Sequence, residues 1–102
     1  MKLFALFTTA ALVIAAPSVQ ASEALAEKNA CLGCHAISEK VVGPAFIDVA
    51  AKYKGQKDAP TVLFQKVRNG GSGVWGTVAM PANKKVSDKD LKKIIGWILA
   101  QK

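Results

Sequence analysis

The only two cysteines and the only histidine of this 102-residue chain lie together, in the segment Cys31-Leu32-Gly33-Cys34-His35. Cys-x-x-Cys followed at once by His is the attachment pattern of a c-type haem. Each thiol can add across one vinyl group of the haem, and the histidine beside the second thiol can meet the iron. On a helix, residues 31, 34 and 35 are neighbours. The pattern therefore predicts a covalently bound haem c, around which the rest of the chain must fold.

The other known uses of a cysteine pair need partners that this sequence lacks. A thioredoxin-like redox pair belongs to a βαβ unit, and a structural zinc site needs two further Cys or His ligands. The sequence contains no further cysteine or histidine, so carboxylates would have to complete a zinc site. A plain disulfide between Cys31 and Cys34 is the main alternative to haem attachment.

Residues 1–21 have the composition of a secretory signal peptide. Lys2 is the only charged residue among them, and Leu3 to Ala16 is an unbroken run of apolar residues and threonines. Val19-Gln20-Ala21 has the small-residue pattern that signal peptidase cleaves. The apolar run is shorter than the ~20 residues that span a bilayer, which disfavours a retained membrane anchor. We expect cleavage after Ala21 and export to the periplasm, without stable membrane insertion afterwards.

The remaining segment, 22–102, is expected to form one small domain. A hydrophobic core of this size supplies only ~3–5 kcal/mol, so a haem bonded to the chain would act as its staple. The segment has thirteen Lys and Arg against seven Asp and Glu. Such a basic balance can attract nucleic acid, acidic lipid or acidic proteins. Export argues against nucleic acid, which leaves steering toward an acidic protein surface or a merely solvated basic surface.

Helical patterns separated by Gly, Pro and Asn predict an all-α domain. A first helix is expected from a Ser22 cap through the haem motif to about His35, with acidic residues near its start. A second spans 46–53 before Gly55. A third follows Pro60 and ends at Asn69-Gly70.

The last helix has the strongest pattern. Ser87 and Asp90 form an S-x-x-D capping pattern, and apolar residues follow at i, i+3, i+4 and i+7. This stripe consists of Leu91, Ile94, Ile95 and Ile98. We expect the first and last helices to pack together, with about four short helices in all wrapped around the haem. Only Val41-Val42 hints weakly at a strand.

Met80 is the best candidate for the second iron ligand, because 22–102 contains no other methionine and no second histidine. A lysine could bind iron only after losing its proton. Pro81 disfavours helical geometry at Met80 and holds it in a loop; ordinary packing of the thioether is the alternative. A His35/Met80 pair raises the reduction potential above that of bis-histidine ligation. With both faces of the iron filled, the protein would carry single electrons and would not be an enzyme.

A set of short motifs gives the chain its resemblance to a known family: CLGCHAI, VGPAF, DVAAKY, GVWG, WILAQK and the Met80 loop. It resembles the small bacterial class I cytochromes c of the cytochrome c-551/c-552 group over essentially all of 22–102. The resemblance implies the cytochrome c fold and three further haem-binding residues. Pro44 would offer its carbonyl to His35 Nδ1, Trp75 would donate its indole N–H to a haem propionate, and Asn83 would hydrogen-bond near the methionine sulfur.

The chain departs from its relatives in two places near the haem. Relatives often carry prolines where Ala79 and Ala82 stand, so the Met80 loop is expected to be less stiff. Some relatives place an arginine near a propionate where this chain has Lys66, with Arg68 two positions on. A lysine does not reproduce the planar fork of arginine.

The resemblance further implies a soluble, monomeric periplasmic shuttle. It would carry single electrons from a membrane respiratory complex to a terminal oxidase or reductase such as nitrite reductase, docking transiently on acidic protein surfaces. One alternative is a fixed electron-transfer subunit of a larger reductase. A gas-binding or peroxidatic haem protein is less favoured, because it needs an open iron and, in cytochromes c′, a haem motif near the C-terminus of a four-helix bundle.

Overall fold

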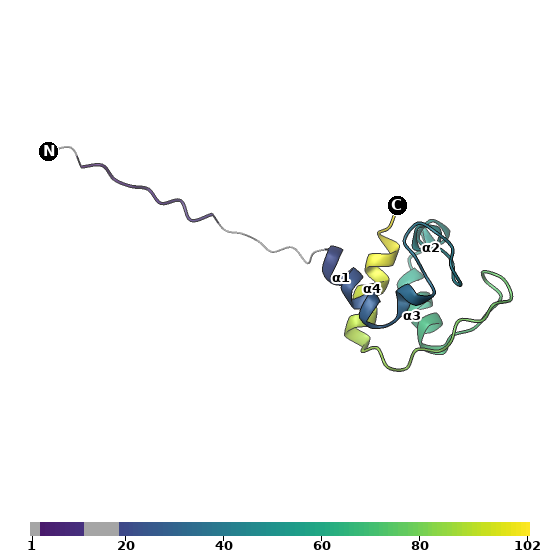
Figure 1. The fold of residues 1–102 in the computed structure, drawn as a ribbon. Coiled ribbons are helices and arrows are strands. Elements are labelled where there is room, and N and C mark those ends of the chain that lie inside the picture. Colours follow the sequence, from purple (N-terminus) through teal and green to yellow (C-terminus); the bar gives the residue numbers. More distant parts are fainter. Residues whose placement is uncertain (1–2, 12–18) are drawn as a thin grey trace.

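The computed structural model describes residues 3–11 and 19–102 (Figure 1). Its helices are α1 (Val19–Lys28), the short 3-10 helix η1 (Cys31–Gly33), α2 (Phe46–Tyr53), α3 (Ala59–Asn69) and α4 (Asp88–Leu99). The described residues form no strand, and their one isolated β-bridge joins Gly71 to Met80. The predicted all-α class, with about four short helices, is confirmed.

The predicted signal peptide, 1–21, is described only in part, because residues 1–2 and 12–18 lie outside the described residues. Residues 3–11 have no regular secondary structure. Their large apolar side chains are between 88% and 98% exposed: Leu3, Phe4, Leu6 and Phe7. No helix in the described part of the chain is long and apolar enough to cross a membrane. Cleavage after Ala21 stays a prediction.

The first helix differs from its prediction at both ends. It begins at Val19, so the expected cap Ser22 lies inside it. It ends at Lys28 instead of near His35, because Ala30 has a left-handed backbone with φ of 63°. An α-helix cannot continue through that conformation, which is costly for a residue with a Cβ. After this break the chain winds more tightly into η1, which contains the first residues of the haem motif.

The second and third helices follow their sequence patterns closely. Helix α2 buries Phe46, Val49, Ala50 and Tyr53 on one face. Helix α3 has Pro60 in its first turn and ends at Asn69, followed by the C-cap Gly70, whose φ is 69°. Proline suits a first helical turn because the N–H that it lacks would have no partner there, and glycine adopts positive φ without steric strain. Both boundaries agree with the prediction.

Helix α4 forms the centre of the domain. The Ser87 hydroxyl accepts a hydrogen bond from the Asp90 N–H at 3.1 Å, which confirms the predicted N-cap. The predicted apolar stripe is buried, with each side chain 8% exposed or less: Leu91, Ile94, Ile95 and Ile98. Helix α4 packs against α1, α2 and α3 (Figure 1), so the expected pairing of first and last helices is present.

Candidate haem site

The two thiols lie on the tight turn that follows α1. The carbonyl of Cys31 accepts hydrogen bonds from the N–H groups of Cys34 at 3.3 Å and of His35 at 3.0 Å, which close this turn. Both cysteines are free thiols, so the disulfide alternative is not realised in this structure. Burial raises the pKa of the Cys31 thiol, while a hydrogen bond to its own backbone lowers it in part. Cys34 is exposed.

The His35 ring is held from several sides. Its Nδ1 lies 2.7 Å from the carbonyl oxygen of Pro44, and a carbonyl can only accept, so Nδ1 carries the proton and Nε2 keeps a lone pair. One ring face stacks on Phe46, with centroids 5.0 Å apart and planes 19° apart. Gly43 fits beside the ring, because a Cβ there would overlap ring atoms. This geometry presents Nε2 as a metal ligand of fixed direction.

The segment Val42–Gly43 reaches this position by folding back onto the haem motif. The Cys34 carbonyl accepts from the N–H groups of Val42 at 3.1 Å and of Gly43 at 2.7 Å. Farther along, the N–H of Phe46 donates to the carbonyl of Ala36 at 2.9 Å. These bonds place Pro44 next to His35. They also place Phe46, the first residue of α2, against the histidine ring.

Met80 is held by a different part of the chain. Its N–H donates to the Gly71 carbonyl at 2.9 Å, and its carbonyl accepts from the Gly71 N–H at 3.0 Å. Gly70 allows this pairing, because a Cβ at that position would overlap backbone atoms of Met80, Pro81 and Ala82. The methionine backbone is therefore fixed to the end of α3.

A cavity of about 530 Å³ lies between these segments. Helix α4 contributes part of its buried stripe to the wall, including Leu91 and Ile95. All seven predicted haem-binding residues line this one cavity: Cys31, Cys34, His35, Pro44, Trp75, Met80 and Asn83. A wide apolar cavity with two thiols, an imidazole nitrogen and a soft thioether sulfur suits a flat apolar macrocycle with an iron centre. The residues present therefore fit a haem.

The zinc alternative lacks a ligand set in the described part of the chain. Among residues 3–11 and 19–102, no three His, Cys, Asp or Glu side chains are grouped so that they could hold a metal ion. The two thiols and His35 are the only strong zinc ligands that the sequence offers.

Trp75 and Asn83 line the cavity from the segment that follows α3. The Trp75 ring is 44% exposed, and the Lys52 ammonium lies 5.5 Å from its centroid. The Asn83 amide oxygen accepts from the N–H groups of Lys85 at 3.1 Å and Val86 at 3.2 Å. With its oxygen engaged in this way, the amide nitrogen of Asn83 is the part available as a donor. The roles of both residues toward a haem stay predictions.

Two basic residues near the end of α3 have different surroundings. Lys66 is among the residues that line the cavity, whereas Arg68 is not. Arg68 instead bonds to Asn83 and Asp88. Lys66 is therefore the cation of this pair that can approach a haem propionate.

Sequence reasoning missed the contacts that Gly43 and Phe46 make with His35. The sequence signal for Gly43 is its place directly before Pro44, which suggests a close backbone approach. Nothing local identifies Phe46 as a partner of the histidine, since the same residue also belongs to the buried face of α2.

Comparison with known proteins gives a consistent result. Residues 17–98 match the family model described as "Cytochrome C oxidase, cbb3-type, subunit III". The chain is 49% identical over 96 residues to cytochrome c-552 of Nitrosomonas europaea, an alignment that covers 94% of this chain and 92% of that protein. It is 42% identical over 100 residues to cytochrome c-551 of Pseudomonas aeruginosa, with 98% and 95% covered.

The fold is also shared with solved structures. The crystal structure of wild-type Nitrosomonas europaea cytochrome c552 superposes with a TM-score of 0.76 at 51% sequence identity. The match covers 78% of this chain and 99% of that one. Sequence and structure thus point to one group of proteins.

Proposed function

This chain belongs to the small bacterial class I cytochromes c of the cytochrome c-551/c-552 group, and from that premise we propose that it is a periplasmic shuttle for single electrons. Its cofactor is haem c, attached through Cys31 and Cys34. Proteins of this group carry electrons and are not enzymes. The electrons would pass from a membrane respiratory complex to a terminal oxidase or reductase, such as nitrite reductase.

The proposal assigns the two axial positions to His35 and Met80. The haem, once bound, takes up and releases one electron. His35 would bind the iron through Nε2, because Nδ1 is committed to the Pro44 carbonyl. Met80 would supply a sulfur that favours the reduced iron. The observation that carries this assignment is that both residues line the same cavity as the two thiols.

Three further residues would support the haem without binding iron. The Pro44 carbonyl orients the His35 ring and makes it a better donor. Trp75 would donate its indole N–H to a propionate, and the Lys52 ammonium over its ring adds positive charge nearby. Asn83 would direct its amide nitrogen toward the Met80 sulfur. Each role requires only an atom that the structure leaves available.

Transient docking would use the haem edge near Cys31 and Cys34. Cys34 is exposed, and so are Val41 and Val42, each at 53%. An interface below ~1,200 Å² is typical of short-lived redox encounters. Residues 22–102 have thirteen Lys and Arg against seven Asp and Glu, a net charge of +6, which favours acidic partners. Electron transfer to an acidic partner should slow as ionic strength rises, and a salt-independent rate would contradict steering by charge.

Export is proposed from residues 1–21. Composition supports this proposal, because Lys2 is the only charged residue of the segment and Leu3 to Ala16 is an unbroken run of apolar residues and threonines. N-terminal sequencing of the natively purified protein should read Ser22 first; finding Met1 would contradict cleavage.

A redox titration followed by absorbance tests the central claim. We expect one haem c, a single one-electron wave, and the weak far-red band of iron–methionine ligation in the ferric state. Met80→Ala should abolish that band, lower the potential and let imidazole bind, because the iron loses its sulfur ligand. A Met80→Ala variant with the wild-type spectrum and potential would rule out Met80 as the ligand.

A fixed electron-transfer subunit is the second candidate, and the name of the matched family model, a subunit of an oxidase, is the observation that favours it. Size-exclusion chromatography of the natively purified protein separates the two. A free shuttle elutes as a small monomer, whereas a subunit elutes with its complex.

A further inference from the structure

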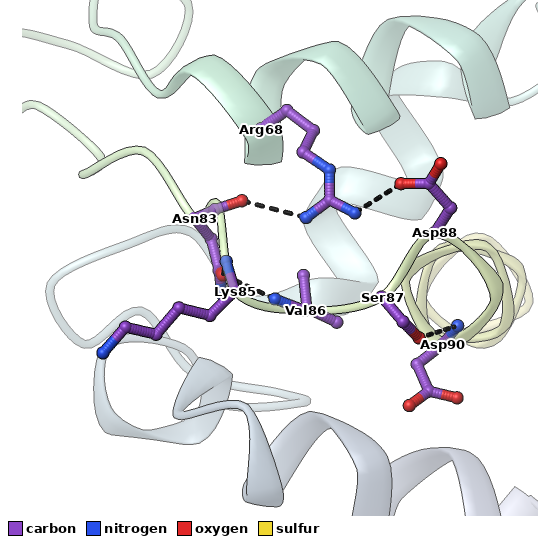
Figure 2. Close-up of polar contacts among 7 residues, drawn as sticks. All are labelled: Arg68, Asn83, Lys85, Val86, Ser87, Asp88 and Asp90. Atoms are coloured by element: carbon purple, nitrogen blue, oxygen red, sulfur yellow. Dashed lines mark hydrogen bonds and ion pairs between the residues drawn. The ribbon is translucent and has the colours of Figure 1, made fainter.

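Arg68 joins three segments that lie apart in the sequence (Figure 2). It projects from the last turn of α3, and its Nη1 donates a hydrogen bond to the backbone carbonyl of Asn83 at 3.1 Å. Its Nη2 forms an ion pair with Asp88 Oδ1, at the start of α4, at 2.6 Å. The guanidinium carbon also lies 5.3 Å from the centroid of the Phe64 ring. Contacts with all three segments thus fix the guanidinium.

The contact with Asn83 matters because Asn83 closes the loop that carries Met80. The Asn83 N–H donates to the Val67 carbonyl at 2.8 Å. This carbonyl lies in the last turn of α3, where carbonyl groups have no N–H partner within the helix. Its own carbonyl is the one that Arg68 binds. The backbone of Asn83 is therefore held to α3 from both sides, just after Pro81 and Ala82.

The two contacts of Arg68 differ in strength. The Asp88 side chain is 74% exposed, so water and salt screen its ion pair, and such pairs contribute little. The Arg68 side chain is only 15% exposed, and its bond to the Asn83 carbonyl is a partly buried, charge-assisted hydrogen bond. Bonds of this kind are roughly twice as strong as neutral ones. The Asn83 contact is therefore the one expected to restrain the loop.

We propose that Arg68 is a positioning residue for Met80, which fixes the end of the Met80 loop and so keeps the thioether sulfur on the iron. This role rests on the proposed His35/Met80 ligand set. The loop has two anchors: the Gly71 pairing at Met80 itself and the α3 contacts at Asn83. With alanine at positions 79 and 82, hydrogen bonds carry the restraint that proline rings would otherwise share.

The test compares Arg68→Met with Asp88→Ala in the haem-loaded protein. Imidazole competes with Met80 for iron, so its apparent affinity rises with the fraction of molecules whose loop is open. We expect Arg68→Met to strengthen imidazole binding about ten-fold, the effect of losing one charge-assisted hydrogen bond. Native-state amide exchange at Met80 and Asn83 should accelerate by a similar factor. Asp88→Ala should change both readouts less than about two-fold.

Three controls separate positioning from general destabilisation. Lys92→Met removes an exposed positive charge from α4 and should change neither readout. Amide exchange at Ile95, in the buried stripe of α4, reports global opening and should change less than exchange at Met80. Arg68→Lys keeps the charge but not the two-pronged geometry, and should give an intermediate effect.

The outcomes are distinguishable. If the wild type shows the iron–methionine band and Arg68→Met binds imidazole no better than Lys92→Met does, the positioning role is wrong. The role is also wrong if Arg68→Met strengthens imidazole binding equally in a Met80→Ala background, because Arg68 would then act by another route. A wild-type spectrum without the band would overturn the ligand set itself, and the positioning role with it.

Discussion

The proposed iron ligand His35 depends on single-residue contacts with little room for change. The Pro44 carbonyl fixes the proton on Nδ1, the Phe46 ring covers one face, and Gly43 leaves just enough space beside the ring. Phe46 in turn meets Trp97 edge-on, with centroids 5.4 Å apart and planes 75° apart. The histidine is therefore coupled through aromatic packing to the buried face of α4.

Gly43→Ala should disturb the histidine directly, since the new Cβ would overlap the His35 ring. We expect a loss of ~1–3 kcal/mol in the free energy of unfolding, typical of forcing extra volume into a packed site. Urea unfolding of the haem-loaded protein measures it, as a lower midpoint at unchanged slope.

Gly33→Ala is the matched control for this substitution. Gly33 lies in the same haem motif, but a Cβ there meets nothing within 4 Å. It should unfold at nearly the wild-type urea concentration. Equal midpoints for wild type, Gly33→Ala and Gly43→Ala would show that the ring can move aside without loss of stability.

At the scale of elements, the sequence predicted what depends on local pattern. The bounds of α2, the first turn of α3 and the cap of α4 follow from periodicity, proline and serine, and the structure confirms each. The break between α1 and η1 could not be predicted in the same way. It depends on left-handed backbone at Ala30, a residue whose intrinsic preference is helical.

The residues of the candidate site fall into the same two groups: those that a local pattern predicts and those whose role depends on the fold. Cys31, Cys34 and His35 could be predicted as haem-binding residues from the CxxCH pattern, and Met80 from the scarcity of other iron ligands. The pairing of Gly71 with Met80 and the bond from Arg68 to Asn83 could not, because each joins positions brought together only by the fold. The sequence around Arg68, Gly70 and Gly71 is compatible with several local roles for these residues. Only their contacts in the folded structure show which role applies.

Ser87→Ala tests how much the start of α4 depends on its cap. The Ser87 hydroxyl accepts the N–H of Asp90, and removing an N-cap oxygen typically costs about 1 kcal/mol of stability. Thermal or urea unfolding of the haem-loaded protein should show that loss. Ser38→Ala, at an exposed serine in a bend, should leave stability within about 0.5 kcal/mol of wild type. Equal loss in both variants would exclude the cap as the cause.

At the scale of the whole molecule, the cavity and the hydrophobic core share their walls. Seven buried residues belong to both: Phe46, Val49, Tyr53, Leu91, Ile94, Ile95 and Ile98. A small domain that surrounds such a space cannot close its core with its own side chains. The haem is therefore expected to fill the middle of the core as well as to carry the electron.

Removal of the haem should then unfold most of the domain. Without the haem, apolar side chains that line the cavity of about 530 Å³, such as Leu91 and Ile95, would face water instead of a packed neighbour. A core of this size supplies only ~3–5 kcal/mol, so the loss of these contacts leaves little net stability. Protein produced without haem attachment should therefore show weak helical circular dichroism and poor amide dispersion. Adding haem should restore part of the helical signal, whereas a haem-free protein that melts cooperatively with full helix content would show that the side chains close the core by themselves.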